Sequence, residues 1–193
     1  EYGWVRIMNQ TWMSENLSYL PDVHRVENSS NLFPRYYVYD YNDIVVKEAK
    51  ESSNYREYGV LYNWIAALNA CPPGWHLPTD EEWQELEMNL GMSKLNAGNA
   101  GWRGSFEGRL MKAKEGWNNG GNGSNISDFT ALPGGFRLPD NTFNYKGVFG
   151  NWWTSTEYNE KDGWIRYLYY NNAGVYRGTF SKSYGYSVRC IQD

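Results

Sequence analysis

Two histidines and two cysteines are the residues of this 193-residue chain best suited to catalysis or metal binding. His24 lies in a polar stretch. His76 lies between Trp75 and Leu77 in a turn rich in proline and glycine, which favours a structural, hydrogen-bonded role. The chain has no Ser-His-Asp elbow, no histidine spacing typical of a metal site and no phosphate-binding Gly-x-Gly-x-x-Gly loop. The sequence therefore predicts a protein that is not an enzyme and that uses no cofactor.

The two cysteines, Cys71 and Cys190, form an even pair that is compatible with one disulfide. Such a bond would close a loop of roughly 120 residues and contribute up to about 5 kcal/mol to stability in the chain-entropy model. The alternative is two buried thiols, which are common in proteins of reducing compartments. We expect the disulfide, because the aromatic-rich composition is typical of an exported domain.

Exposed aromatic side chains beside amide and guanidinium groups could bind a carbohydrate. Sugar rings stack on Trp and Tyr, while Asn and Arg hydrogen-bond the sugar hydroxyls. The residues that we predict for such a site are Trp102, Arg103, Trp117, Asn118, Trp164, Tyr169, Tyr176 and Arg177. Burial is the alternative for each Trp, since a loop-rich chain with 10 Trp must bury most of them. We assign six others to the core: Trp12, Trp64, Trp75, Trp83, Trp152 and Trp153.

The composition favours one loop-rich domain stiffened by aromatic packing. The chain holds 10 Trp, 17 Tyr and 20 Gly, and only 21% of its residues are charged. A net charge of −4 without a basic block argues against a nucleic-acid partner. No apolar run is long enough to span a membrane. We expect membrane attachment, if any, through a leader or lipid anchor removed from before Glu1.

The expected elements of this single domain, 1–193, follow from local patterns. A hairpin occupies 1–20, and apolar residues at helical spacing predict helices over about 58–70 and 80–90. The second helix begins with Thr79, which forms a capping box with Glu82. A long loop region is expected over 92–145, and an antiparallel sheet over 146–193 with a hairpin joining its late strands.

Five segments together resemble one family, the FISUMP domain (Fibrobacter succinogenes major paralogous domain). The central one is the run from Cys71 to Trp83, Cys-Pro-Pro-Gly-Trp-His-Leu-Pro-Thr-Asp-Glu-Glu-Trp. The others are Trp12–Leu17, Tyr58–Trp64, Ala131–Arg137 with Trp152–Thr156, and Ser187–Ile191. They cover nearly the whole chain in the family's order, so the resemblance is specific.

The order of elements also resembles the C-type lectin-like fold, an α+β fold with two helices, a twisted antiparallel sheet and long irregular loops. This resemblance implies a bridge from Cys71 to Cys190, because that fold joins the Cys after its first helix to its last strand. Calcium is possible in that fold but disfavoured here. The chain has Leu138-Pro139-Asp140 and Asn151-Trp152-Trp153 where sugar-binding lectins carry Glu-Pro-Asn and Trp-Asn-Asp.

These patterns predict a non-enzymatic binding or adhesion module, extracellular or on a bacterial cell surface. The expected ligand is a glycan or a cell-surface protein. The resemblance also extends to the formylglycine-generating enzymes, which use two neighbouring reactive cysteines, so an active or degenerate enzyme of that type is one alternative. A structural domain of a surface assembly is another.

Overall fold

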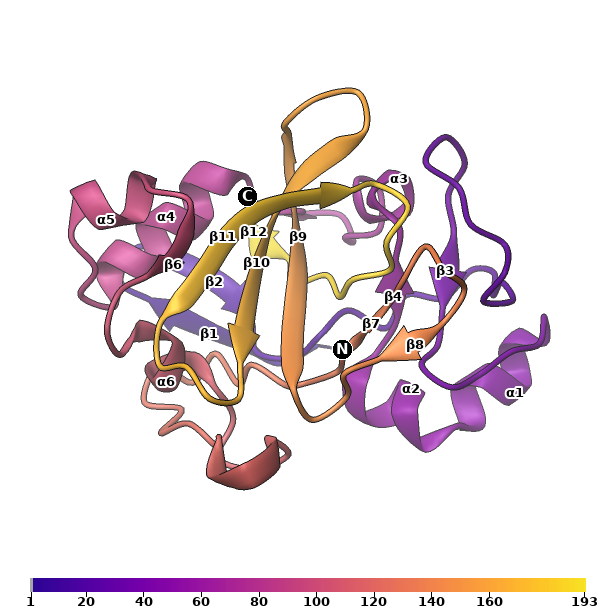
Figure 1. The fold of residues 1–193 in the computed structure, drawn as a ribbon, viewed down its shortest axis with the longest axis horizontal. Helices are drawn as coiled ribbons and strands as arrows, with labels where there is room; N and C mark the ends of the chain where they lie inside the picture. The colour runs from indigo at the N-terminus through magenta and orange to yellow at the C-terminus, as the bar shows by residue number, and fades with distance from the viewer. Residues whose placement is uncertain (1) are drawn as a thin grey trace.

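The computed structural model describes residues 2–193, which form an α+β fold of short helices and antiparallel sheets (Figure 1). The predicted α+β class is therefore confirmed. The expected hairpin region 1–20 begins at Glu1, which lies outside the described residues.

The largest sheet carries most of the C-terminal half of the chain. Its strands are β9 (Phe149–Glu157), β10 (Asp162–Tyr169) and β11 (Val175–Ser181), and β6 (Gly101–Arg103) adds to β11. All neighbours are antiparallel, in the order β6-β11-β10-β9. The predicted late hairpin is present as β10 and β11, whereas β6 comes from the region that the sequence predicts as loop.

A second sheet joins both ends of the chain. The N-terminal hairpin is β1 (Trp4–Ile7) and β2 (Gln10–Met13), and β12 (Ile191–Gln192) lies between β2 and β5 (Trp75–His76). The expected sheet over 146–193 is thus divided, since its last strand belongs to this second sheet.

Helix α4 (Asp80–Asn89) begins at the predicted capping box. The Glu82 amide donates to Thr79 Oγ1 at 3.1 Å, and the Thr79 amide donates to Glu82 Oε2 at 2.7 Å. The other Glu82 oxygen lies 2.9 Å from His76 Nε2, and His76 Nδ1 lies 2.7 Å from Asp193. His76 therefore links β5, the start of α4 and the end of the chain, which agrees with a structural role.

The single helix predicted over 58–70 is wrong. The chain forms α2 (Ser53–Tyr58), then β4 (Leu61–Tyr62), then α3 (Trp64–Ala67). Gly59 stops α2 with φ +73°, and a Cβ there would lie 2.7 Å from the Leu17 carbonyl oxygen. Strand β4 pairs with β3 (Tyr36–Tyr37), so long-range pairing replaces the helix that local periodicity favours.

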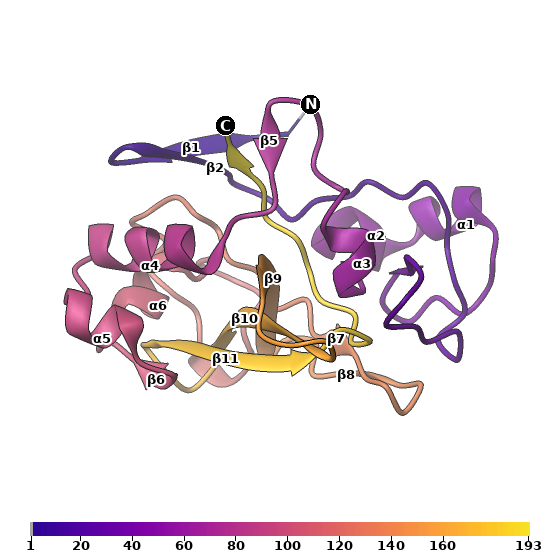
Figure 2. The same ribbon diagram turned by 90° about the horizontal axis from the view of Figure 1, so that it is seen from above.

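Short elements also interrupt the predicted loop region 92–145. Besides β6, they are α5 (Lys94–Gly98), α6 (Glu107–Met111), the 3₁₀ turn η1 (Asn118–Gly120), β7 (Phe136–Arg137) and β8 (Phe143–Asn144). With α1 (Val46–Glu51), six α-helices occur among residues 2–193, against the two expected. Seen from above, α1–α3 lie at one end of the molecule and α4–α6 at the other (Figure 2).

The expected disulfide joins Cys71 to Cys190, with Cα atoms 6.0 Å apart, and Cys190 is fully buried. Five of the six tryptophans assigned to the core are buried, and Trp75 is half-buried on β5. Around Trp83, the rings of Trp12 and Phe129 pack edge-to-face with centroids 5.0 and 5.7 Å away. This core packs against one face of the large sheet through Trp152, Leu168 and Val175. The opposite face of the sheet carries the candidate site.

Candidate functional site

A row of side chains crosses the outer face of the large sheet. The residues directly opposite one another on β6, β11, β10 and β9 are Trp102, Tyr176, Tyr167 and Asn151. At about 4.8 Å per strand the row spans about 14 Å. The ring centroids of Trp102 and Tyr176 lie 5.6 Å apart, and those of Tyr176 and Tyr167 lie 4.1 Å apart in a stacked pair. Trp102 is 41% exposed, so the row begins with an accessible aromatic surface.

Glycine makes room for this row. Gly178 follows Tyr176 on the same face of β11, because side chains two residues apart share a face. A Cβ at Gly178 would lie 2.6 Å from Tyr176 Cε1. The missing side chain lets the Tyr176 ring lie over the strand, where it stacks on Tyr167.

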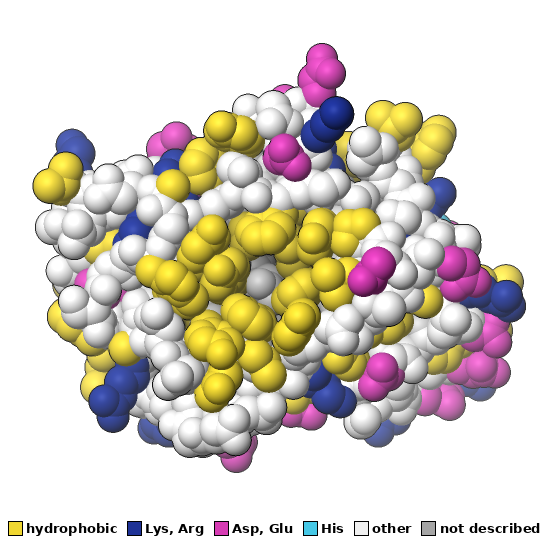
Figure 3. Space-filling model, viewed as in Figure 1, with side chains coloured by type: hydrophobic (Ala, Val, Ile, Leu, Met, Phe, Trp, Pro, Cys, Tyr) yellow, Lys and Arg dark blue, Asp and Glu magenta, His cyan; other side chains and the backbone are white. Residues whose placement is uncertain are grey.

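Beyond Tyr167 the surface sinks into a cavity of about 380 Å³, which we call the aromatic hollow. Figure 3 shows it as a depression ringed by hydrophobic side chains at the centre of the sheet face. Its lining residues are Phe136, Leu138, Tyr145, Phe149, Asn151, Tyr167, Phe180, Tyr184 and Tyr186. None of these side chains carries a charge at neutral pH. The hollow is therefore suited to an uncharged ligand.

Asn151 is the one amide among the lining residues. It is only 3% exposed, and its Nδ2 has no hydrogen-bond partner within residues 2–193. In the sheet, Asn151 lies opposite Tyr167, and its main-chain carbonyl accepts a hydrogen bond from the Ser187 amide. A buried polar group without a partner is rare in native structures, and because Asn151 lines the hollow, a ligand there could supply that partner.

Three of the tyrosine hydroxyls that line the hollow stay protonated across the neutral range. Burial raises the pKa of Tyr167, Tyr184 and Tyr186, and for Tyr167 the neighbouring Tyr176 raises it further. Each protonated hydroxyl can donate as well as accept a hydrogen bond. The hollow thus combines apolar ring faces with neutral donors and acceptors.

Three of the predicted site residues, Tyr169, Tyr176 and Arg177, lie on the β10–β11 hairpin. Tyr169 and Tyr176 lie on this face of the sheet, and Arg177 does not. Tyr169 stacks on Phe149 at 4.7 Å and contacts Trp102 at 6.4 Å. Arg177 follows Tyr176 and so points to the opposite face, where its guanidinium lies 3.8 Å from the centre of the half-buried Trp164 ring. Arg177 and Trp164 are therefore separated from the aromatic hollow by the sheet itself.

A buried ion network holds that opposite face to helix α4. Arg166 Nη1 lies 2.6 Å from Asp80, and its Nε lies 2.7 Å from Glu87. Arg103 donates twice to Glu87, and Arg177 donates to Asp80 at 2.6 Å. Arg103 donates to Glu87 and to the Ala97 carbonyl beneath the sheet, which argues against the ligand contact that the sequence predicts for it. The sequence shows Asp80 only as a favourable helix N-terminal residue, because its arginine partners lie more than 80 positions away.

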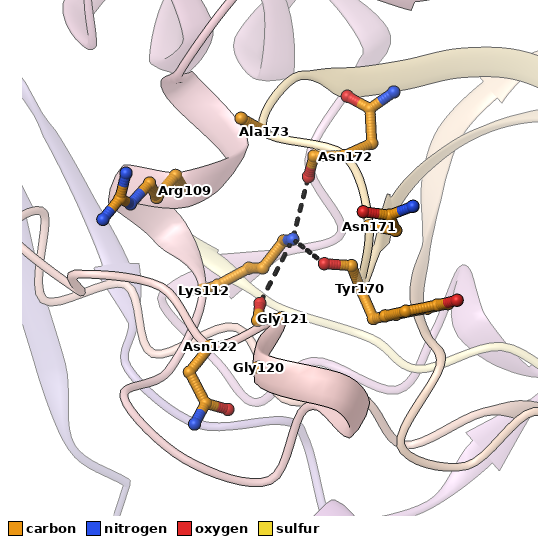
Figure 4. Close-up of a pocket in the computed structure, with 9 residues that line it drawn as sticks. All are labelled: Arg109, Lys112, Gly120, Gly121, Asn122, Tyr170, Asn171, Asn172 and Ala173. Carbon is orange, nitrogen blue, oxygen red and sulfur yellow. Dashed lines mark hydrogen bonds between the residues drawn. The ribbon is translucent and has the colours of Figure 1, made fainter.

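Trp117 and Asn118 lie elsewhere, beside a second, polar hollow of about 410 Å³ between the Asn-rich loop and the β10–β11 turn (Figure 4). Trp117 is 4% exposed and donates to the Ala131 carbonyl, so it belongs to the core rather than to a binding surface. Asn118 is exposed on η1.

Lys112 dominates this polar hollow. Figure 4 shows its ammonium group among the main-chain carbonyls of Gly121, Tyr170 and Asn172, with Asn172 O at 2.8 Å. The Tyr169 carbonyl lies 2.7 Å away. Burial lowers the pKa of Lys112 to about 8. Because its donors are already used within the chain, Lys112 ties the β10–β11 turn to α6 and is not free for a ligand.

The described part of the chain contains no cluster of side chains arranged to bind a metal ion. Within residues 2–193, no three His, Cys, Asp or Glu side chains converge as ligands. Asp140, in the segment that aligns with the lectin calcium motif, accepts from the Thr142 hydroxyl at 2.6 Å.

The structure is thus that of a disulfide-bridged α+β domain whose large sheet carries an aromatic-lined hollow. The chain belongs to the family described as the Fibrobacter succinogenes major domain, whose model matches residues 5–192. This finding confirms the family resemblance seen in the sequence. No curated protein and no solved structure matches the chain. Among the described helices, none has both the length and the apolar character needed to cross a bilayer.

Proposed function

We propose that this domain is a non-enzymatic binding or adhesion module of an exported, surface-displayed protein, and that the aromatic hollow binds a neutral glycan. The observation that carries the proposal is the hollow itself: apolar ring faces, neutral hydroxyls and one unpaired amide, with no charged lining residue. Sugars present apolar C–H faces and hydroxyls together, which is the combination that such a lining complements.

The disulfide supports both export and the wider resemblance. The disulfide fits an oxidising compartment. It also joins the two cysteines that the C-type lectin-like fold would bridge, so we propose that architecture for the domain. The alternative of a formylglycine-generating type of enzyme requires two reactive thiols, and here both cysteines are consumed by the bond.

The test is a glycan array followed by calorimetry with the sugars that bind. Trp102→Ala should weaken binding about ten-fold, since stacking contributes on the order of 1–2 kcal/mol. Trp4→Ala is the matched control, because Trp4 is also exposed but lies on β1 in the other sheet. It should bind as wild type.

A second pair checks the hollow from its other side. Tyr145, 50% exposed, lines the hollow, whereas Tyr158, 57% exposed, lies beside Trp164 on the opposite face. Tyr145→Ala should weaken glycan binding and Tyr158→Ala should not. Failure of every glycan to bind would refute the proposal. Capture of a surface protein through the same hollow would then favour the protein-ligand alternative.

A further inference from the structure

The residues at the base of the aromatic hollow favour one class of neutral glycan over the others. This inference rests on the glycan-binding function proposed above. We propose that the hollow recognises the acetamido group of an N-acetylated aminosugar, with Asn151 as the residue that determines specificity.

Asn151 presents a complete amide. Its buried side-chain nitrogen has no hydrogen-bond partner within residues 2–193, and its side chain lines the hollow. A primary amide carries a donor and an acceptor in one plane, so it pairs with a group that has both in the same arrangement. A secondary amide of the ligand satisfies both at once, whereas a single hydroxyl satisfies them in a less favourable geometry.

The walls around Asn151 select what accompanies that amide. Phe149 and Tyr167 flank Asn151 on the sheet, and Phe136 and Tyr186 close the cavity with rings 5.6 Å apart. These faces suit a methyl group and exclude an ion, since a charge buried without a counterion carries a large desolvation penalty. A ligand group that combines a methyl with an amide is an acetamido group. Carboxylated, phosphorylated and sulfated sugars are excluded by the same argument.

The exposed row explains how more than one sugar unit is held. From Asn151 it continues through the stacked Tyr167 and Tyr176 to Trp102. An N-acetylated unit in the hollow would therefore be followed by units lying across these aromatic rings. The row contributes to binding of any neutral oligosaccharide, while Asn151 discriminates among them.

Two matched pairs of sugars isolate the acetamido group. N,N′,N″-Triacetylchitotriose and cellotriose share ring stereochemistry and β1,4 linkage and differ at the acetamido position. The monosaccharides N-acetylgalactosamine and galactose differ in the same way. By calorimetry, the N-acetylated member of at least one pair should bind about ten-fold more tightly or better, the factor expected from two additional hydrogen bonds. Equal affinity within both pairs would overturn the acetamido inference and leave the glycan proposal standing. Binding by none of the sugars, here or on the array, would overturn both.

Variants separate the two roles. Asn151→Leu should remove the preference for the N-acetylated sugar and keep the residual affinity for its partner, with an unchanged melting temperature or a higher one because an unpaired amide is lost. Trp102→Ala should weaken both members of a pair by the same factor. A preference retained in Asn151→Leu would overturn the inference. If that variant does not fold, the sugar pairs on the wild-type protein still decide the question.

Discussion

Replacing Asp80 by Asn tests whether the buried ion network, rather than local helix capping, fastens α4 to the large sheet. The substitution keeps the size of the side chain and removes the negative charge shared by Arg166 and Arg177. Arg166 is fully buried and Asp80 is 2% exposed, so solvent cannot replace the lost partner. Breaking such a buried pair costs about 3–5 kcal/mol. That is a large share of the roughly 5–15 kcal/mol by which domains are stable.

Glu81→Gln is the matched control. Glu81 is the next residue of α4, is exposed, and meets the same helix dipole. Its replacement should cost about 0.3–1 kcal/mol. Urea unfolding of the oxidised proteins, followed by tryptophan fluorescence at pH 7, gives both free energies of unfolding. A cost for Asp80→Asn within about 1 kcal/mol of the Glu81→Gln value would refute the reasoning.

The same variant predicts a pH dependence. Burial opposes ionisation of Asp80, but the hydrogen bonds and charges of Arg177 and Arg166 outweigh it and hold the pKa below the ordinary 3.8. An acid with a lowered folded-state pKa contributes stability above its unfolded pKa and loses it as the pH falls through the folded value. The difference between wild type and Asp80→Asn should therefore stay constant from pH 7 to 5 and shrink only below 3.8. A difference that shrinks already near pH 6 would contradict this assignment.

Three other changes have expected outcomes. Replacing Cys71 and Cys190 together by Ser opens a loop with a sequence separation of 119 and should cost up to about 5 kcal/mol in chemical denaturation, as should reduction of the wild type. His76→Gln should lose stability relative to wild type at pH 6 but not at pH 9. Partial burial lowers the pKa of His76, its two carboxylate partners raise it by more, and the stabilisation is lost as the pH rises through the raised value. Gly59→Ala should cost at least about 1–3 kcal/mol in thermal or urea unfolding, because Gly59 has φ +73° and an added Cβ would lie 2.7 Å from the Leu17 carbonyl oxygen. Gly98→Ala is the control and should be neutral, because a Cβ at Gly98 would meet no atom within 4 Å. Equal costs at the two glycines, a pH-independent His76 effect, or an unaffected cysteine variant would contradict the respective argument.

Features with a local cause could be predicted from the sequence. The capping box at Thr79 depends on residues three positions apart, and the β10–β11 hairpin depends on a short turn between alternating strands. The single helix predicted over 58–70 does not form, because residues distant in the sequence pair with its middle. Tyr62 pairs with Tyr36 and forms a bridge with Tyr186, which no local pattern contains.

The candidate site could be predicted only in part for the same reason. Trp102, Tyr169 and Tyr176 lie on the proposed binding surface. The sequence could predict them because aromatic residues in loops and in alternating strands are recognisable as candidates for stacking on a ligand. The sequence shows Asn151 only within Asn151-Trp152-Trp153, at the place of the lectin Trp-Asn-Asp motif, and its unpaired side chain is visible only once β9 and β10 are aligned. The sequence does not show that Arg103 is paired with Glu87, because the packing of α4 brings the two residues together.

The position of the disulfide has a mechanical consequence for a domain displayed on a surface. Strand β12 is the last strand, and Cys190 immediately precedes it. A force that pulls on the chain after Cys190 can detach only the segment that follows Cys190 before the load passes through the disulfide to Cys71. From there it is transmitted to the segment between α3 and β5, in the interior of the chain. While the disulfide is intact, a domain tethered through its C-terminal side would therefore resist unfolding from that side. The face of the large sheet that carries the aromatic hollow would then keep its structure under tension.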